Sequence, residues 1–252
     1  MRITDNIYLL SGGNFAAVGD MSMLGEVYGI YTSKGMIIID SGGPKTGPAR
    51  IRETLADLKI CKPITHVILT HGHWDHAGGA KELQEAGAKV IIGKEDAIYC
   101  KNGGIKGMYT PFGSKKQMMG KYSMFDVEQN FPAFIPDIII EDDCMMNING
   151  LCFEFVKVPG HSPGSMVISL QIDGKTSLFT GDFIQPDGVL FEDFVPWWNG
   201  DPNFNCADIV NSTMKLMDRK ADLILPGHGK ICLKNGAAIL RHAAQMAFLT
   251  MR

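Results

Sequence analysis

The chain has 252 residues, of which 45% are hydrophobic and 20% charged, so it can bury a sizeable core and shows no compositional sign of disorder. Its net charge of −3 gives no global electrostatic case for binding nucleic acid, and no apolar run approaches the roughly 20 residues needed to span a bilayer. The N-terminal stretch lacks the long apolar core of a signal peptide, and the six cysteines include no Cys-x-x-Cys pair. We therefore expect a cytoplasmic protein with reduced thiols and no membrane segment.

From the N-terminus, the pattern of apolar residues predicts strands and helices in alternation. Strands are predicted where β-branched and aromatic residues cluster between turns, and helices where apolar residues recur at helical spacing. In chain order, we expect three strands within residues 6–40, a helix over 47–59, a strand over 66–70, a helix from about Ala77 to Ala86, a strand over 88–93 and a short helix over 94–101.

The second half of the chain is richer in predicted strands. We expect an irregular, lid-like insertion over about 99–136, within a single domain that spans residues 1–252. Asn149-Gly150 and Asp173-Gly174 are predicted hairpin turns. Beyond the insertion, we expect strands over 138–141, 144–148, 152–158, 165–172 and 176–182, a helix over 204–219, a strand over 221–229 and a final helix over 236–250.

One arrangement of elements occurs twice in the sequence. GMIIID, a helix and HVILTHGH in the first half resemble TSLFTGD, a helix and ADLILPGH in the second. In both, a strand ends in Asp and, after a helical connection, another strand ends in His. Two related β-rich halves, each backed by helices, would bring these four strand ends together. We therefore predict an α/β fold of two packed sheets with helices outside.

The stretch THGHWDHAGG, residues 70–79, places three of the chain's seven histidines within six positions. Residues two apart in an extended chain point the same way, so His71 and His73 can reach one ion from one side. Asp75 and His76 lie where the chain turns into the next helix, and they can face a second ion nearby. The stretch is therefore a candidate metal-ligand cluster.

Three more candidate ligands follow strands later in the chain. His161, Asp182 and His228 each come after a small turn whose Gly or Pro lets the backbone aim a side chain across the sheet ends. A lone buried histidine is more often a hydrogen-bonded structural residue, and we assign that role to His66 and His242. Five histidines and two aspartates at strand exits are explained better by metal binding than by separate structural roles.

The donor set indicates the metal and the chemistry. Imidazole and carboxylate without thiolate suit zinc, and also iron or manganese. Seven such donors exceed what one tetrahedral zinc needs, so two divalent ions close together are the economical account. Two ions that share a water lower its pKa towards neutrality and hold the resulting hydroxide beside a substrate carbonyl or phosphoryl group. The sequence therefore predicts a metal-dependent hydrolase.

The run His71-x-His73-x-Asp75-His76, with the three later donors in order, closely resembles the metallo-β-lactamase fold superfamily. The resemblance extends from Asp40 to His228 and implies a four-layer αββα sandwich with its metals at one edge of the two sheets. It assigns His71, His73 and His161 to one ion, Asp75, His76 and His228 to the other, and Asp182 to both. Asp75 is also assigned a catalytic role.

Asp40, which ends GMIIID, matches the superfamily's first motif, a carboxylate that orients a metal ligand. An ordinary turn aspartate before Ser41-Gly42-Gly43 explains the same residue equally well from the sequence alone. Both interpretations stay open at this point.

Differences between this sequence and the motifs of the superfamily's subgroups reduce the number of candidate substrate classes. Asp182 argues against a true β-lactamase, whose members carry Cys or Ser there, and His73 stands where flavodiiron enzymes have a glutamate. GDFIQPDGVLFEDF replaces the Gly-Cys-Gly-Arg stretch of glyoxalase II, which disfavours a glutathione thioester. No tyrosine lies between Asp182 and His228, as one does in quorum-quenching lactonases. We expect hydrolysis of an ester-like bond, either a thioester, a lactone or an amide.

Two irregular stretches are candidates for a substrate pocket. From Ala97 to Phe125 no acidic residue occurs, while lysines alternate with aromatic residues that include Tyr109 and Phe112. The pattern fits a lid or wall for an anionic small-molecule substrate, a groove for single-stranded nucleic acid, or a solvated loop with its aromatics packed beneath. Trp197 and Trp198 fit a pocket wall near the metals, and equally a contact in a homodimer.

Two rival functions remain beside the hydrolase. An iron-dependent oxidoreductase can use the same fold, and it would bind iron and consume oxygen. A nuclease of the ribonuclease Z kind needs an arm that grips RNA, and the acidic balance of the chain disfavours it.

Overall fold

Two β-sheets pack face to face in the computed structural model, which describes residues 1–12, 25–105, 131–186, 194–195 and 201–251. Within these residues, the strand order is β1-β2-β3-β4-β5-β6 in one sheet and β13-β10-β9-β8-β7 in the other. The strands of the first sheet are β1 (Ile7–Ser11), β2 (Val27–Thr32), β3 (Gly35–Ile39), β4 (Ile64–Ile68), β5 (Lys89–Gly93) and β6 (Ile138–Ile140). Those of the second are β7 (Cys144–Ile148), β8 (Leu151–Lys157), β9 (Met166–Ile172), β10 (Lys175–Gly181) and β13 (Leu223–Pro226). A short pair, β11 (Gln185–Pro186) and β12 (Phe194–Val195), was not predicted.

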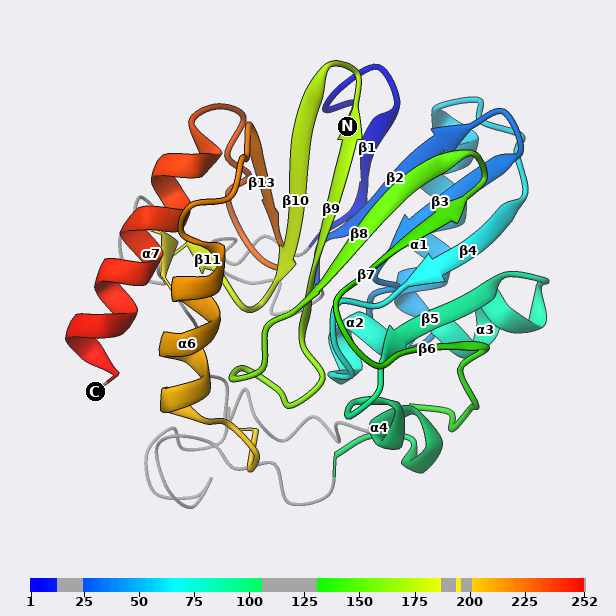
Figure 1. The fold of residues 1–252 in the computed structure, drawn as a ribbon. Helices are drawn as coiled ribbons and strands as arrows, with labels where there is room; N and C mark the ends of the chain where they lie inside the picture. The colour runs from blue at the N-terminus through cyan, green and yellow to red at the C-terminus, as the bar shows by residue number, and fades with distance from the viewer. Residues whose placement is uncertain (13–24, 106–130, 187–193, 196–200, 252) are drawn as a thin grey trace, which may run out of the picture.

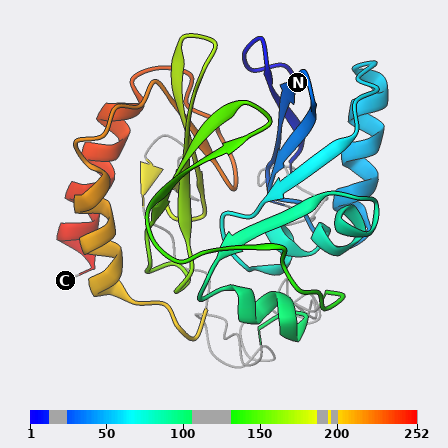
Figure 2. The same cartoon turned by 45° about the vertical axis from the view of Figure 1, so that its right-hand side comes forward.

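Helices cover the outer faces of both sheets (Figure 1; Figure 2). The helices on the side of the first sheet are α1 (Thr46–Asp57), α2 (Trp74–Ala77), α3 (Ala80–Glu85) and α4 (Ala97–Asn102). Those against the second sheet are α6 (Cys206–Leu216) and α7 (Gly236–Thr250). The result is the four-layer αββα sandwich that the sequence predicts.

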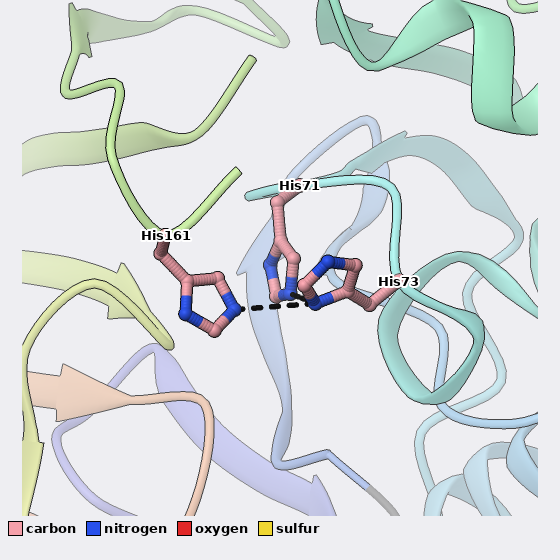
Figure 3. Close-up of side chains that lie close together, drawn as sticks. All are labelled: His71, His73 and His161. Atoms are coloured by element: carbon pink, nitrogen blue, oxygen red, sulfur yellow. Dashed lines mark hydrogen bonds between the residues drawn. The ribbon is translucent and has the colours of Figure 1, made fainter. Parts of the chain in front are cut away.

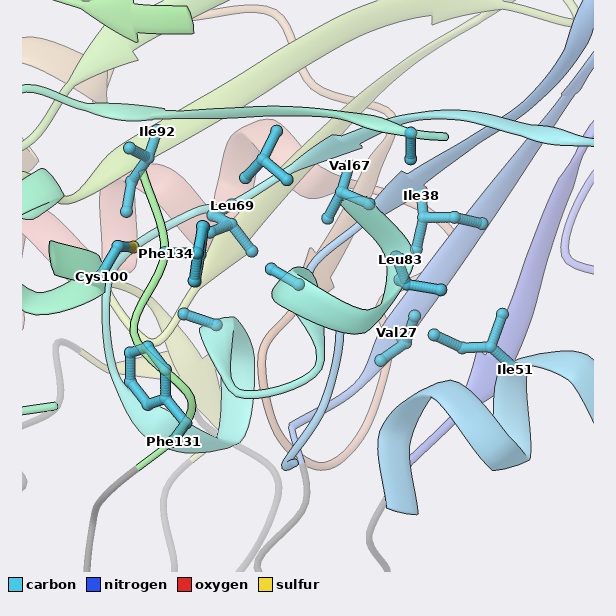
Figure 4. Packing of buried hydrophobic residues seen from close by; sticks show 14 of the residues in the cluster. Val27, Ile38, Ile51, Val67, Leu69, Leu83, Ile92, Cys100, Phe131 and Phe134 are labelled. Carbon is cyan, nitrogen blue, oxygen red and sulfur yellow. The ribbon is translucent and has the colours of Figure 1, made fainter. Parts of the chain in front are cut away.

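Alternate residues of a strand face different layers, as the two-residue period of a strand requires. In β3, Ile37 and Ile39 pack between the two sheets, whereas Ile38 faces the outer layer. There Ile38 lies near Ile51 of α1 and Leu83 of α3, within a fully apolar cluster (Figure 4). Because both faces of β3 are buried, the strand reads as the continuous apolar run GMIII.

The second sheet follows the same rule. Phe155 and Phe179 point between the sheets, whereas Leu178 and Ile224 pack against the helices α6 and α7. Tyr28 of the first sheet reaches across the core, and its hydroxyl donates a 2.7 Å hydrogen bond to the carbonyl of Pro226. The two sheets are therefore joined by apolar packing and by a direct polar contact.

The repeated arrangement predicted from the sequence is present. β3 pairs with β4 in parallel, and β10 pairs with β13 in parallel. Each pair is connected through a helical segment, so the carboxyl ends of all four strands can meet at one edge. The predicted turns Asn149-Gly150 and Asp173-Gly174 also close hairpins, with positive φ at both residues of each turn.

The helix predicted from Ala77 to Ala86 is split and begins earlier. Residues Trp74–Ala77 form the one-turn helix α2, and α3 begins at Ala80 after Gly78-Gly79. A Cβ at Gly78 would lie 2.2 Å from the Trp74 carbonyl oxygen and 2.5 Å from Cδ of Pro44, and one at Gly79 would lie 2.5 Å from the Ser41 carbonyl oxygen. The two glycines thus let the chain pass close to residues 41–44, and this contact cannot be read from local periodicity.

The described structure also shows the state of the cysteines and the character of the helices. All six cysteines are free thiols. Within the described residues, no helix has the length and apolar composition that crossing a bilayer would require.

Candidate metal centre

The seven candidate ligands lie together at one edge of the two sheets. They come from five places in the fold, each just after a strand or on the first turn that follows it. His71 and His73 follow β4, Asp75 and His76 lie on α2, His161 lies between β8 and β9, Asp182 follows β10, and His228 follows β13. All seven side chains are buried, His228 being the most exposed at 9%.

His71, His73 and His161 form one group of converging imidazoles (Figure 3). Nδ1 of His73 lies 2.9 Å from Nε2 of His71 and 3.2 Å from Nε2 of His161. Nitrogens bound tetrahedrally to zinc at 2.0–2.1 Å would lie roughly 3.3 Å from one another. The three nitrogens therefore already have the spacing of ligands around a single ion.

Asp75, His76 and His228 form a second group. Nε2 of His228 lies 3.0 Å from Oδ2 of Asp75 and 3.3 Å from Nε2 of His76. Nε2 of His76 lies 3.5 Å from the same carboxylate oxygen. Two imidazoles and one carboxylate thus present their donor atoms to a common point.

Asp182 lies between the two groups. Its Oδ1 is 3.1 Å from Nε2 of His76, and its Oδ2 is 3.4 Å from Nε2 of His228 and 3.7 Å from Nε2 of His161. Oδ1 is buried and accepts no hydrogen bond of good geometry from any residue that the structure describes. A buried carboxylate oxygen in that situation is costly unless a cation satisfies it. The orphaned oxygen and the donor set together fit a metal between the groups.

Glycines keep space beside these donors. A Cβ at Gly227 would lie 2.2 Å from Oδ1 of Asp182 and 2.7 Å from Cε1 of His76. A Cβ at Gly25 would lie 2.8 Å from the same carbon of His76. No residue larger than glycine fits at either position without displacing a donor.

The electrostatics of the site favour positive charge. Burial and the charges of neighbouring histidines lower the pKa of His71 well below its usual value, so this ring is neutral. Burial also opposes the charged form of His228, but Asp182 and Asp75 outweigh it and raise the pKa of His228 to about 10. The same two carboxylates raise the pKa of His76 well above its usual value despite burial. Protons on two imidazoles thus balance the carboxylates, in a place that a divalent cation can occupy instead.

Asp40 contacts one of the candidate ligands directly. Its Oδ2 accepts a 2.8 Å hydrogen bond from Nδ1 of His76, and its Oδ1 accepts a 2.7 Å bond from the Thr70 amide. Asp40 has a φ of +59°, which is uncommon for a residue other than glycine. Asp40 therefore contacts a candidate metal ligand, and its role in orienting that ligand stays a prediction.

Asp201 was not identified from the sequence, although it contacts His73 as Asp40 contacts His76. Its Oδ2 lies 2.9 Å from Nε2 of His73, and both groups are buried. The Tyr99 hydroxyl lies 3.3 Å from the same oxygen and accepts a 2.9 Å bond from the Asn203 side chain. Asp201 lies in the turn-like run Asp-Pro-Asn, far from His73 along the chain, so no local signal distinguishes it from an ordinary turn residue.

Several predicted residues cannot be placed. The pocket candidates Tyr109, Phe112, Trp197 and Trp198 lie outside the described residues, as does the part of the lid-like insertion that spans 106–130. His66 and His242 belong to none of the donor groups found among the described residues.

Comparison with known proteins agrees with the fold. The sequence model of the metallo-beta-lactamase superfamily matches residues 24–228. Hydroxyacylglutathione hydrolase GloC of Haemophilus influenzae is 30% identical over 200 residues, which are 78% of this chain and 81% of that protein. An atrochrysone carboxyl ACP thioesterase of Aspergillus fumigatus is 25% identical over 224 residues, which are 88% of this chain and 40% of that protein. A metallo-β-lactamase structure from Cronobacter sakazakii superposes with a TM-score of 0.72 at 20% identity, covering 99% of this chain and 91% of that one.

The chain therefore belongs to the metallo-β-lactamase superfamily, a group of metal-dependent hydrolases. The likeness to the solved β-lactamase shows the shared fold.

Proposed function

We propose that this protein is a hydrolase that holds two divalent metal ions, with zinc as the expected metal, and cleaves a thioester-like bond in a small molecule. The observation that carries the proposal is the convergence of two donor groups on either side of Asp182. His71, His73 and His161 would hold one ion, Asp75, His76 and His228 the other, and Asp182 would contact both.

Two such ions, when bound by these residues, would supply Lewis acidity for activating water and polarising a substrate carbonyl. The chain itself supplies orientation and a place for a proton. Asp40 and Asp201 fix the rings of His76 and His73 through the nitrogen that faces away from the donor group. Burial alone would raise the pKa of Asp75, but His76 and His228 lower it overall, so its carboxylate is ionised at neutral pH and can accept a proton from a nucleophilic water.

The thioester assignment is supported by two relatives. One is named a hydroxyacylglutathione hydrolase and the other an ACP thioesterase, so both names describe cleavage of an acyl–sulfur bond. The sequence between Asp182 and Asp193 lacks the Gly-Cys-Gly-Arg stretch of glyoxalase II, so the thiol portion of the substrate is the part to vary in a screen.

The test begins with elemental analysis of protein purified without added metal, followed by a panel of thioesters, lactones, phosphodiesters and β-lactams. We expect two equivalents of zinc and turnover of thioesters. His71→Ala and His73→Ala should lose metal and at least about 100-fold in kcat/KM, because each removes a ligand. His242→Ala is the matched control and should retain both.

Three results would count against the proposal. Full metal content and full activity in His71→Ala would show that the proposed metal site is wrong. Bound iron with oxygen consumption would identify the rival oxidoreductase instead. Turnover of phosphodiesters alone would identify a nuclease-like hydrolase.

A further inference from the structure

Asp96 is a buried carboxylate that contacts two of the loops at the candidate metal centre. It lies directly before α4 and is 0% exposed. Its Oδ2 accepts hydrogen bonds from the Gly72 amide at 2.8 Å and from the Ser162 hydroxyl at 2.6 Å. Its Oδ1 accepts a 2.7 Å bond from the Gly164 amide. Two backbone amides and one hydroxyl thus converge on the oxygens of a carboxyl group whose pKa is raised by burial.

The donors to Asp96 are neighbours of the three converging histidines. Gly72 stands between His71 and His73, in the loop that leaves β4 of the first sheet. Ser162 and Gly164 follow His161, in the turn between β8 and β9 of the second sheet. One carboxylate thus ties together the two segments that supply the whole three-histidine group.

The backbone around this contact is packed without spare room. A Cβ at Gly164 would lie 2.5 Å from the amide nitrogen of Asp96. A Cβ at Gly93 would lie 2.2 Å from the Gly164 carbonyl oxygen, and one at Gly72 would lie 2.7 Å from Cδ2 of Tyr99. The segment from Gly93 to Tyr99 therefore touches both loops directly, and movement of either loop would break contacts with it.

We propose that Asp96 is a positioning residue that sets the separation between His161 and the His71–His73 pair, and thereby the affinity of the three-histidine group for a metal ion. The inference rests on the proposed function, because it assumes that this group binds metal. A role confined to folding would lower stability without favouring either donor group, whereas the proposed role affects one group selectively.

The test is a titration of chelator-treated protein with Co²⁺ in competition with a chromogenic chelator, which resolves the affinity of each ion. His161→Ala and His228→Ala provide reference spectra for loss of the three-histidine ion and of the other ion. In Asp96→Asn, an amide nitrogen replaces one acceptor oxygen, so at least one donor loses its partner. We expect the three-histidine ion to bind about 10–100-fold more weakly and the other ion to change less than about 3-fold.

Amide hydrogen exchange supplies a second measurement that does not depend on metal. The amides of Gly72 and Gly164 should exchange faster in metal-free Asp96→Asn than in the wild type, because both donate to the replaced carboxylate. Thr213→Val is the stability control, since its buried hydroxyl bonds only to carbonyls of its own helix among the described contacts. It should leave both affinities and both glycine amides unchanged.

Ser162→Ala provides a milder change if Asp96→Asn does not fold. It removes one of the three donors and leaves the two backbone contacts, so a selective loss of about 3–10-fold is expected at the same ion. Wild-type affinities in both variants, or equal losses at both ions, would overturn the role of Asp96 and leave the proposed function intact. Retention of two tightly bound ions in both His161→Ala and His228→Ala would overturn the proposed function itself.

Discussion

The Asp40 carboxylate and the His76 imidazole are joined by a 2.8 Å hydrogen bond between Oδ2 and Nδ1. Once His76 loses its second proton, this bond keeps the remaining one on Nδ1, which leaves the lone pair of Nε2, 3.1 Å from Asp182, able to bind a cation. Asp40 reaches the ring because the chain turns with a positive φ at the end of β3, where the Thr70 amide holds the other carboxylate oxygen.

Replacing Asp40 with Asn should weaken binding at the group formed by Asp75, His76 and His228. Asn tolerates positive φ, so the substitution removes the charge and one acceptor while sparing the backbone. We expect the affinity of this ion to fall about 10–100-fold, as measured by chelator competition. Asp173→Asn makes the same change at a positive φ of 54° in an exposed hairpin turn, and it should leave the affinity unaltered. An equal effect of the two substitutions would rule out the specific role of Asp40.

Substitutions of Asp201 and of its neighbour Tyr99 should weaken metal binding at the three-histidine group to different degrees. Asp201→Asn should cost about 10–100-fold in the affinity of that ion, because it disturbs the partner of Nε2 of His73. Tyr99→Phe should cost about 5-fold or less, since its hydroxyl contacts Asp201 only at 3.3 Å and 3.4 Å. Chelator competition on both proteins checks the order, and a larger loss in Tyr99→Phe would show that the carboxylate is not the main support of His73.

The two donor groups should respond differently to pH. His228, with a pKa raised to about 10, and His76, with a pKa also raised, must each release a proton before they bind a cation. The affinity of their ion should therefore rise between pH 7 and pH 9, by up to about 100-fold per unit if both protons leave. His71, whose pKa is lowered, is neutral across this range and releases none.

Calorimetry in buffers of different ionisation enthalpy counts the released protons directly. The His228→Ala variant should release about one proton fewer than the wild type at pH 7. Affinities that are flat from pH 7 to pH 9 for both ions would contradict this account of the site.

Gly227→Ala should reduce the metal content of the protein while the fold persists. The added methyl would lie 2.2 Å from Oδ1 of Asp182, so the carboxylate must leave its place between the two groups. We expect loss of at least one equivalent of metal by elemental analysis, with a cooperative thermal transition retained. Gly87→Ala, whose Cβ would meet nothing within 4 Å, should cost about 1–2 kcal/mol through its φ of +107° and keep its metal. Full metal content in Gly227→Ala would show that Asp182 can move without consequence.

The sequence predicts most of the architecture because its signals are local. The helix expected over 236–250 matches α7, and the five strands expected between residues 138 and 182 fall within a residue of their predicted ends. The strand expected over 221–229 is shorter, at Leu223–Pro226. The seven candidate ligands could be listed because each follows an apolar run at a strand exit. The helix expected from Ala77 was wrong at its start because Gly78-Gly79 respond to packing against Pro44 and Ser41, which lie elsewhere in the chain.

The carboxylates that contact the candidate ligands or their neighbours could not be found from local sequence patterns alone. Asp201 lies 128 positions from His73, and Asp96 contacts Gly72 and Gly164 from a third segment. Nothing in spacing or composition links these residues before the chain is folded. Asp40 could be proposed because it ends GMIIID and matches the first motif of the superfamily that the chain resembles.

The donors of the centre are divided between the two sheets, with four supplied from the β4–α2 side and three from the β8, β10 and β13 side. The full set of donors for the two ions is therefore assembled only after the two halves of the chain have packed together. A bound ion would then act as a removable crosslink between the two halves, and it would form only in chains that have already folded. The protein should therefore resist proteases better when metal is supplied during its synthesis, and this effect should be as strong as the effect of temperature.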